Sequence, residues 1–146
     1  MAPTRDAVDE FLTAYGNTLV AYDAAVTAAM WGMPGTMVTD VFTGSLSSRD
    51  EMAAGLAQGY PLYRQLGLGG IGHTLLEFAP LTDVVVRVRV RWHFTDDAGD
   101  LLTDSDYEYV LREDPDGLHV YVAVDIDADA KLRELAARRG VDLPDR

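Results

Sequence analysis

The stretch DVVVRVRVRWHF, residues 83–94, decides the fold of this chain. Successive side chains of a β-strand point to opposite faces of the sheet. One face of this stretch therefore carries Val84, Val86, Val88, Val90, Trp92 and Phe94. The other face carries Val85, Arg87, Arg89, Arg91 and His93. This alternation predicts a strand with its first face on a core and its second face turned outward.

Further strands are predicted around this one, at residues 71–78, 103–113 and 118–126, separated by turn signals such as the DPDG group at 114–117. If Glu113 lies opposite Leu118 across that turn, the inner face carries Leu111, Tyr109 and Tyr107 opposite Val120, Val122 and Val124. The outer face then carries Asp104, Asp106, Glu108 and Arg112, with His119, Tyr121 and Asp125. We expect the acidic row to form a cross-strand ladder with the Arg row.

Helical patterns dominate the first half of the chain. A helix with Thr4 as N-cap is predicted up to about Tyr22, with a possible break at Gly16, and a shorter one at 24–31, capped by Asp23. A short strand at 36–42 places Asp40 on one face with its apolar neighbours. Ser48 opens a third helix, which a glycine and a proline near residue 60 should kink or break.

A final helix is predicted at residues 128–139, capped by Asp127 and ended by Gly140. Helices followed by antiparallel strands give an α+β domain in which the helices cover the apolar face of the sheet. The length of 146 residues fits one domain. We expect this domain to span residues 1–127, followed by a C-terminal helix and tail at 128–146.

Composition excludes several functions. The chain has no cysteine, so disulfides, thiolate metal sites and cysteine nucleophiles are excluded. A net charge of −12 repels phosphate backbones and anionic lipids, and we expect neither nucleic acid nor membrane as a partner. Acidic residues near the start argue against a signal peptide, so a cytoplasmic location is expected. The preference for Arg over Lys is typical of a GC-rich bacterial genome.

This layout resembles the nuclear transport factor 2-like superfamily, which includes SnoaL-like cyclases and ketosteroid isomerase. The resemblance is carried by FLTAYGNTLVAYD, AAVTAAMW, MVTDVF followed by TGSLSSRDEM, and YEYVLREDPDGLHVYV. It implies a cone-shaped half-barrel in which helices pack on a strongly curved, mostly antiparallel sheet. It also implies pairing of two copies through the outside of the sheet, so a homodimer is expected.

The resemblance to the isomerase implies catalytic residues. Tyr15 matches the tyrosine that donates to the developing oxyanion, and Asp40 matches the proton-transfer base. The second oxyanion donor of that family is a protonated aspartate, and Tyr107 stands at its place here. Purely structural roles remain open for both residues, because Tyr15 also fits a stripe of core residues on its helix and Asp40 also fits a strand end that bonds backbone amides.

The inner faces are rich in aromatic residues, which suits a pocket for a small hydrophobic or polycyclic molecule. We expect the ligand to contact Leu19, Trp31, Tyr60, Tyr63, Trp92 and Tyr109. His73 lies near a strand start, could face either way, and is a further candidate. The three histidines lack metal-ligand spacing, and we expect no metal and no cofactor. A non-catalytic dimeric binding or assembly module is the alternative function.

Overall fold

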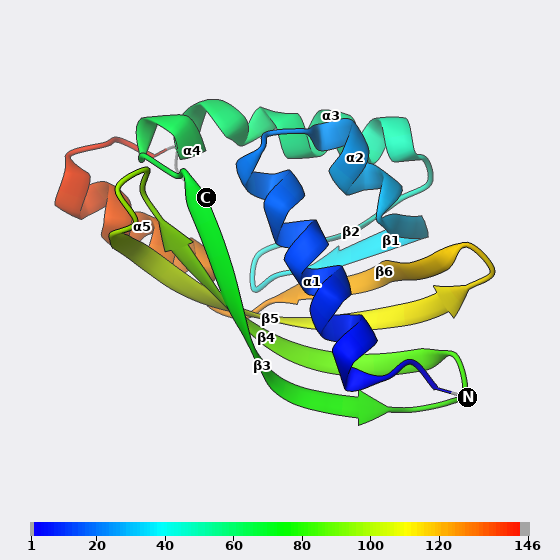
Figure 1. Ribbon diagram of the computed structural model, residues 1–146. Helices are drawn as coiled ribbons and strands as arrows, with labels where there is room; N and C mark the ends of the chain where they lie inside the picture. Colours follow the sequence, from blue (N-terminus) through cyan, green and yellow to red (C-terminus); the bar gives the residue numbers. More distant parts are fainter. Residues whose placement is uncertain (1, 144–146) are drawn as a thin grey trace.

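A computed structural model describes residues 2–143 and shows a curved sheet with helices packed over its inner side (Figure 1). The helices are α1 (Arg5–Val20), α2 (Ala24–Ala29), α3 (Arg49–Gln58), α4 (Tyr60–Gln65) and α5 (Ala128–Arg139). The strands are β1 (Trp31–Val38), β2 (Thr43–Leu46), β3 (Gly70–Pro80), β4 (Val85–Thr95), β5 (Leu101–Asp114) and β6 (Gly117–Asp125). The predicted α+β class is confirmed.

The C-terminal helix occupies the predicted residues, and Gly140 ends it in a left-handed conformation with φ 67°. Residues 144–146 of the predicted tail lie outside the described residues. Within the part of the chain that the structure describes, no helix combines the length and the apolar character needed to cross a membrane.

The six strands follow the order β2-β1-β6-β5-β4-β3, with β1 parallel to β6 and the other neighbours antiparallel. Strand β4 lies near one side of this sheet, and its inner face is buried as predicted from Val86 to Trp92, whereas Val84 precedes the strand and is 38% exposed. Val86, Val88 and Val90 are fully buried, and Trp92 is 1% exposed. They pack into one core with apolar residues of α1, which therefore covers this half of the sheet (Figure 1).

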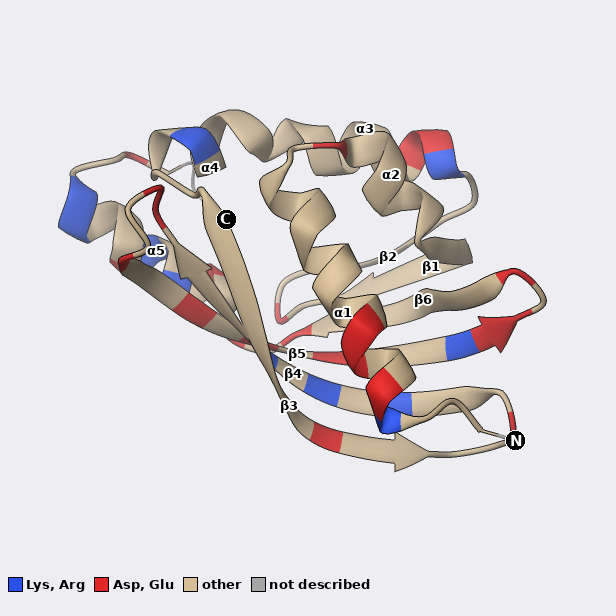
Figure 2. Ribbon diagram, viewed as in Figure 1, with Lys and Arg blue, Asp and Glu red and all other residues tan. Residues whose placement is uncertain are grey.

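The predicted charge ladder is confirmed on the outer face, where Figure 2 shows basic residues along β4 and acidic residues on β5 and β3. Arg87 bonds Glu77 of β3 at 3.2 Å and also contacts Glu108 of β5. Arg91 donates two hydrogen bonds to the Asp106 carboxylate, at 2.8 and 3.0 Å. Arginines of this row thus pair with acidic residues of neighbouring strands.

The predicted helix boundaries follow local side-chain chemistry. The side chains of Thr4, Asp23 and Ser48 each accept a backbone N–H from three residues later, at 3.1, 3.3 and 3.1 Å. Such N-caps satisfy donors that have no partner within the helix. The helix after Ser48 breaks at Gly59, as expected, and continues as α4.

Helix α1 is continuous through Gly16, where a break was possible. A Cβ atom added at Gly16 would lie 3.0 Å from the Trp92 ring and 3.1 Å from Ile71. Glycine therefore brings α1 close to the sheet, and this packing outweighs its low helix propensity.

The predicted bounds of the second helix and the first strand were wrong. Helix α2 ends at Ala29, and Trp31 already belongs to β1, because its backbone pairs with Val120 of β6. Strand β1 ends at Val38, and a turn closed by the Thr39 N–H on the Phe42 carbonyl leads into β2, which the sequence did not predict. Asp40 consequently lies in an exposed turn and not in a strand.

The predicted register of β5 and β6 holds only near the turn. Glu113 pairs with Leu118, but an irregularity follows Leu111, so that Tyr109 pairs with Ala123 and Tyr107 with Asp125. A one-residue shift moves side chains to the opposite face. Asp125 therefore lies on the inner face, where the sequence predicted the outer one.

His119 was placed on the outward face of the sheet, where exposure to solvent is expected, but only 7% of its surface is exposed. Its Nδ1 lies 2.8 Å from the Asp114 carboxylate, and the Tyr121 hydroxyl donates to the same oxygen at 2.7 Å. Burial raises the pKa of Asp114, but these two hydrogen bonds, together with the nearby positive charge of Arg112 and the contact with His119, hold the pKa below its usual value. The side chains at this turn thus form a local hydrogen-bonded cluster.

Candidate functional site

A cavity of about 620 Å³ lies between the inner face of the sheet and helices α1, α3, α4 and α5. Its volume falls within the range of small-molecule sites. Eight residues that the sequence analysis placed at a ligand pocket line it: Tyr15, Leu19, Trp31, Tyr60, Tyr63, Trp92, Tyr107 and Tyr109. The pocket residues predicted from inner-face parity are therefore brought together around one space.

Two candidates lie elsewhere. Asp40 borders a separate small hollow of about 70 Å³ next to Asp125, outside the cavity lining. His73 is also absent from that lining. Its Nε2 instead lies 2.6 Å from the carboxylate of Asp9 on α1. Its ring meets Trp92 edge to face at 5.6 Å. The structure thus gives His73 a contact between α1 and the sheet.

Two tyrosine hydroxyls of the cavity wall are oriented by tryptophans. The Trp31 indole donates to the Tyr15 hydroxyl oxygen at 3.1 Å, and the Trp92 indole donates to that of Tyr109 at 2.8 Å. An indole N–H can only donate, so each tyrosine oxygen acts as the acceptor. Each phenol therefore keeps its own O–H for a group inside the cavity.

Burial keeps these phenols protonated. It raises the pKa of Tyr15 to about 12, and it raises the pKa values of Tyr107 and Tyr109 well above the usual range. The rings of Tyr107 and Tyr109 stack with centroids 5.7 Å apart. At neutral pH this wall presents neutral hydrogen-bond donors, which suit a ligand carbonyl or a developing oxyanion.

Asp125 stands beside Tyr107 at the end of β6. Burial raises the pKa of its carboxyl, although a hydrogen bond from the Ala128 N–H at 2.8 Å opposes the shift. Its negative charge in turn raises the pKa of Tyr107. Sequence parity missed Asp125, because the register irregularity in β5 and β6 has no signature in the residue pattern.

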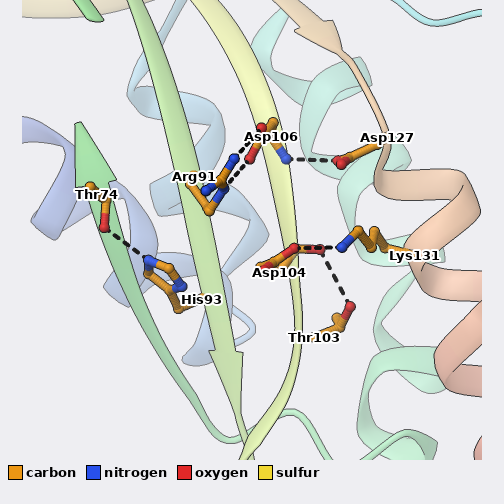
Figure 3. Close-up of polar contacts among 8 residues, drawn as sticks. All are labelled: Thr74, Arg91, His93, Thr103, Asp104, Asp106, Asp127 and Lys131. Carbon is orange, nitrogen blue, oxygen red and sulfur yellow. Dashed lines mark hydrogen bonds and ion pairs between the residues drawn. The ribbon is translucent and has the colours of Figure 1, made fainter. Parts of the chain in front are cut away.

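Helix α5 closes one end of the cavity. Its side chains Ala128, Lys131, Leu132 and Leu135 contribute to the lining. Lys131 bonds Asp104 of β5 at 2.9 Å, and the Asp127 carboxylate accepts the backbone N–H of Asp106 at 2.8 Å (Figure 3). Asp127 stands at the N-cap position of α5, as predicted, but its side chain makes no cap hydrogen bond, and the N–H of Ala128, the first helical residue, donates to Asp125. Asp127, which precedes α5, and Lys131, within α5, are therefore both bonded to β5.

Two buried hydroxyls at the cavity lack good hydrogen bonds. Among residues 2–143, the buried side-chain atoms without a partner are Tyr60 Oη, Arg89 Nε and Ser105 Oγ, and the first and last belong to cavity-lining residues. Thr27 lies near the Tyr60 hydroxyl but donates to Thr18 at 2.6 Å. The Ser105 residue is 3% exposed. No pattern in the residues around Ser105 singles it out.

A group that could hold a metal ion lies outside the cavity, at the β5–β6 turn. Ligand atoms of Asp114, Asp116 and His119 lie within 4.8 Å of one another. The Asp114 oxygen nearest His119 already accepts from Tyr121. The observed bonds give these residues a role in closing the turn.

Residues 5–127 match the model of a protein family described as NTF2-like protein (DUF6841). The chain belongs to this family. Among curated proteins, none matches this NTF2-like protein. The family match ends immediately before α5, so the wall that α5 adds to the cavity lies outside the matched residues.

Solved structures resemble this NTF2-like protein in fold. One is an NTF-2 like protein of unknown function from Shewanella oneidensis, with 15% identity, a TM-score of 0.65, and 84% of this chain and 98% of that chain covered. Another is a ketosteroid isomerase-like protein from Erwinia carotovora atroseptica, with 14% identity, a TM-score of 0.62, and coverage of 83% and 93%.

A third is an NTF2-like protein with a cystatin-like fold from Novosphingobium aromaticivorans, with 19% identity, a TM-score of 0.62, and coverage of 90% and 87%. At such identities the similarity shows the fold alone. The NTF2-like fold of the chain is thus established, and its activity has to be argued from the cavity.

Proposed function

We propose that this NTF2-like protein binds a small hydrophobic or polycyclic molecule in the cavity between its sheet and helices. The observation that carries the proposal is the cavity itself, of about 620 Å³ and lined mainly by aromatic and aliphatic side chains. Tyr15 and Tyr109 supply O–H donors at one place in this apolar wall. An apolar skeleton with a hydrogen-bond acceptor is complementary to that arrangement.

A pair of glycine variants tests ligand binding. Gly55 of α3 lines the cavity, and a Cβ added there meets nothing within 4 Å. A Cβ added at Gly72 of β3 is equally free, but Gly72 is not part of the lining. Gly55→Phe therefore adds a ring next to the cavity, while Gly72→Phe adds the same ring elsewhere.

The measurement is a thermal-shift screen of hydrophobic metabolites, with hits checked by native mass spectrometry. We expect stabilising hits for the wild type and for Gly72→Phe, and a loss of the shift for Gly55→Phe. A ligand at 100 times its Kd stabilises by about 2.7 kcal/mol, which is well within detection. The absence of any hit, or hits that Gly55→Phe retains, would contradict binding in this cavity.

A proton-transfer enzyme is a second candidate, favoured by the contact of Tyr107 with Asp125. In this reaction a carbon next to a ligand carbonyl gives its proton to the Tyr107 oxygen, and Tyr107 passes its own proton to the Asp125 carboxylate. The enolate oxygen is held by the Tyr15 and Tyr109 hydroxyls. Return of the proton to a different carbon completes an isomerisation.

Aspartate variants test this chemistry on a panel of enones. Asp125→Asn removes the proton acceptor, and we expect the rate to fall by about 100-fold or more. Asp40, the aspartate predicted from the family resemblance, borders the same small hollow as Asp125, but Asp125 is the one that contacts Tyr107 of the cavity wall, so Asp40→Asn should retain the wild-type rate. Equal rates for wild type and Asp125→Asn would exclude this role of Asp125. If the wild type converts none of the enones, the proton-transfer function is rejected and only ligand binding remains as the proposed function.

The outer face of the sheet supports a homodimer, which is also the basis of the non-catalytic assembly module. Val110 of β5 pairs with Val122 of β6 on that face, and the charge ladder lies beside them. Apolar residues flanked by both charge signs suit a self-complementary two-fold contact. Light scattering should give a dimer mass for wild type and a monomer mass for Val122→Asp. A monomeric wild type would contradict pairing.

A further inference from the structure

Ser105 is a buried polar residue that the fold does not use. It stands opposite Trp92 on the inner face of the sheet and lines the cavity. Its hydroxyl has no hydrogen-bond partner, although the residue is buried, with only 3% of its surface exposed. A buried hydroxyl without a partner costs stability, so such groups are rare in folded proteins. A serine hydroxyl changes direction by rotation about one torsion angle.

Ser105 and Tyr109 project from different places along β5. Ser105 and Tyr109 lie four residues apart on β5, so their backbones are about 13 Å apart. Trp92 connects the two places, because its backbone pairs with Ser105 and its indole bonds the Tyr109 hydroxyl. The inner face of β5 therefore carries two polar side chains, Ser105 and Tyr109, at separate positions along the strand.

Ser105 belongs to the end of the cavity that α5 closes. Its chain neighbours Asp104 and Asp106 bond Lys131 and Asp127, which are two of the points that attach the α5 segment to the sheet (Figure 3). Leu132 and Leu135 of α5 also line the cavity. A ligand group that reached Ser105 would be enclosed by apolar surface on the α5 side.

We propose that Ser105 is the second polar anchor of the ligand site. The ligand then has an elongated apolar ring skeleton with two oxygen functions, one bonded by the Tyr15 and Tyr109 hydroxyls and one bonded by Ser105 beneath α5. This inference rests on the proposed ligand binding and narrows the ligand class to molecules oxygenated at both ends.

Two probes that differ in one hydroxyl test the assignment: 2,6-dihydroxyanthracene and 2-hydroxyanthracene. Their affinities are measured by fluorescence titration of the whole chain. We expect the wild type to bind the diol about five- to tenfold more tightly, which corresponds to one hydrogen bond. Ser105→Ala should bind both probes with the affinity of the mono-alcohol.

Ser45→Ala is the matched control, since Ser45 also lines the cavity but its hydroxyl already bonds Thr36 at 2.8 Å. It should preserve the preference for the diol. In the absence of ligand, Ser105→Ala should raise Tm by about 2–4 °C, because it removes an unpaired buried hydroxyl. A serine with a structural role would lower Tm instead.

Three outcomes overturn the assignment: a wild type that binds both probes equally, a Ser105→Ala variant that keeps the preference, or a lower Tm for that variant. In each of these, binding of the mono-alcohol leaves the proposed function standing. A wild type that binds neither probe, and gives no hit in the metabolite screen, overturns both proposals together.

Discussion

At the scale of single residues, hydrogen bonds within the aromatic wall determine what the cavity offers. Tyr15 is 5% exposed, and its oxygen receives the Trp31 indole N–H. Removal of either partner would leave a buried polar group unpaired, which costs about 1–3 kcal/mol. The wall is thus held in one arrangement before any ligand binds, and preorganised donors bind an oxyanion with little rearrangement.

The raised pKa of Tyr15 makes stability depend on pH in the alkaline range. The folded state holds the Tyr15 proton up to about pH 12, whereas an unfolded tyrosine loses it near 10. The contribution is complete below pH 10 and is lost as pH rises toward 12, up to about 3 kcal/mol. Urea unfolding at pH 7 and 11 should show this loss, and it should be smaller in Tyr15→Phe. An equal loss in both proteins would contradict it.

At the scale of elements, the charge ladder joins β4 to β5 through ion pairs on the outer face of the sheet. The paired Arg91 guanidinium lowers the pKa of the Asp106 carboxyl, mainly through their hydrogen bonds. A lowered pKa means that the contribution is present above the usual aspartate range and is lost as pH falls through it. Partial exposure of Arg91, 43% for its side chain, limits the strength of this pair.

Arg91→Gln should therefore destabilise the protein only slightly at low salt, and by less at 0.5 M salt. Arg112→Gln serves as the control, because the Arg112 nitrogen lies 3.5 Å from Asp114 and the side chain is 55% exposed. That change should have almost no effect. Urea unfolding at two salt concentrations measures both, and a cost for Arg91→Gln that is independent of salt would argue against an electrostatic origin.

Sequence patterns predicted most elements because alternation, caps and turn residues are local signals. The inner row of β4, the N-caps Thr4, Asp23 and Ser48, and most of the aromatic or aliphatic cavity residues followed from such signals. Trp31 and Asp40 were misplaced because pairing of β1 with β6 joins segments far apart in sequence. Asp125 and Ser105 were missed because a register shift and an unpaired hydroxyl are properties of the folded chain.

At the scale of the whole molecule, α5 attaches to the domain through a small core of its own. Leu135 is 4% exposed and packs with Leu66, the C-cap of α4, and Leu102 of β5. Arg138 adds a hydrogen bond to the Leu102 carbonyl at 2.9 Å. The helix that follows the family match is therefore part of the same folded unit as the cavity it closes.

Leu135→Ala should lower the free energy of unfolding by about 2–4 kcal/mol through lost burial and a new cavity. Ala137→Gly, at an exposed position of the same helix, should cost only about 1 kcal/mol through helix propensity. Urea unfolding followed by tryptophan fluorescence reports both, because Trp31 and Trp92 line the cavity. Equal costs for the two variants would mean that α5 is not packed as described.

The pairing of β1 with β6 has a consequence for how the protein is made. During synthesis the helices α1 to α4 and the strands β1 and β2 leave the ribosome before strands β3 to β6, which form most of the sheet. Strand β1 waits for its partner until the turn at Gly117 has been passed, since Trp31 pairs with Val120. The apolar faces of the first half therefore stay uncovered for most of translation, which makes nascent chains the stage most exposed to aggregation and to chaperone binding.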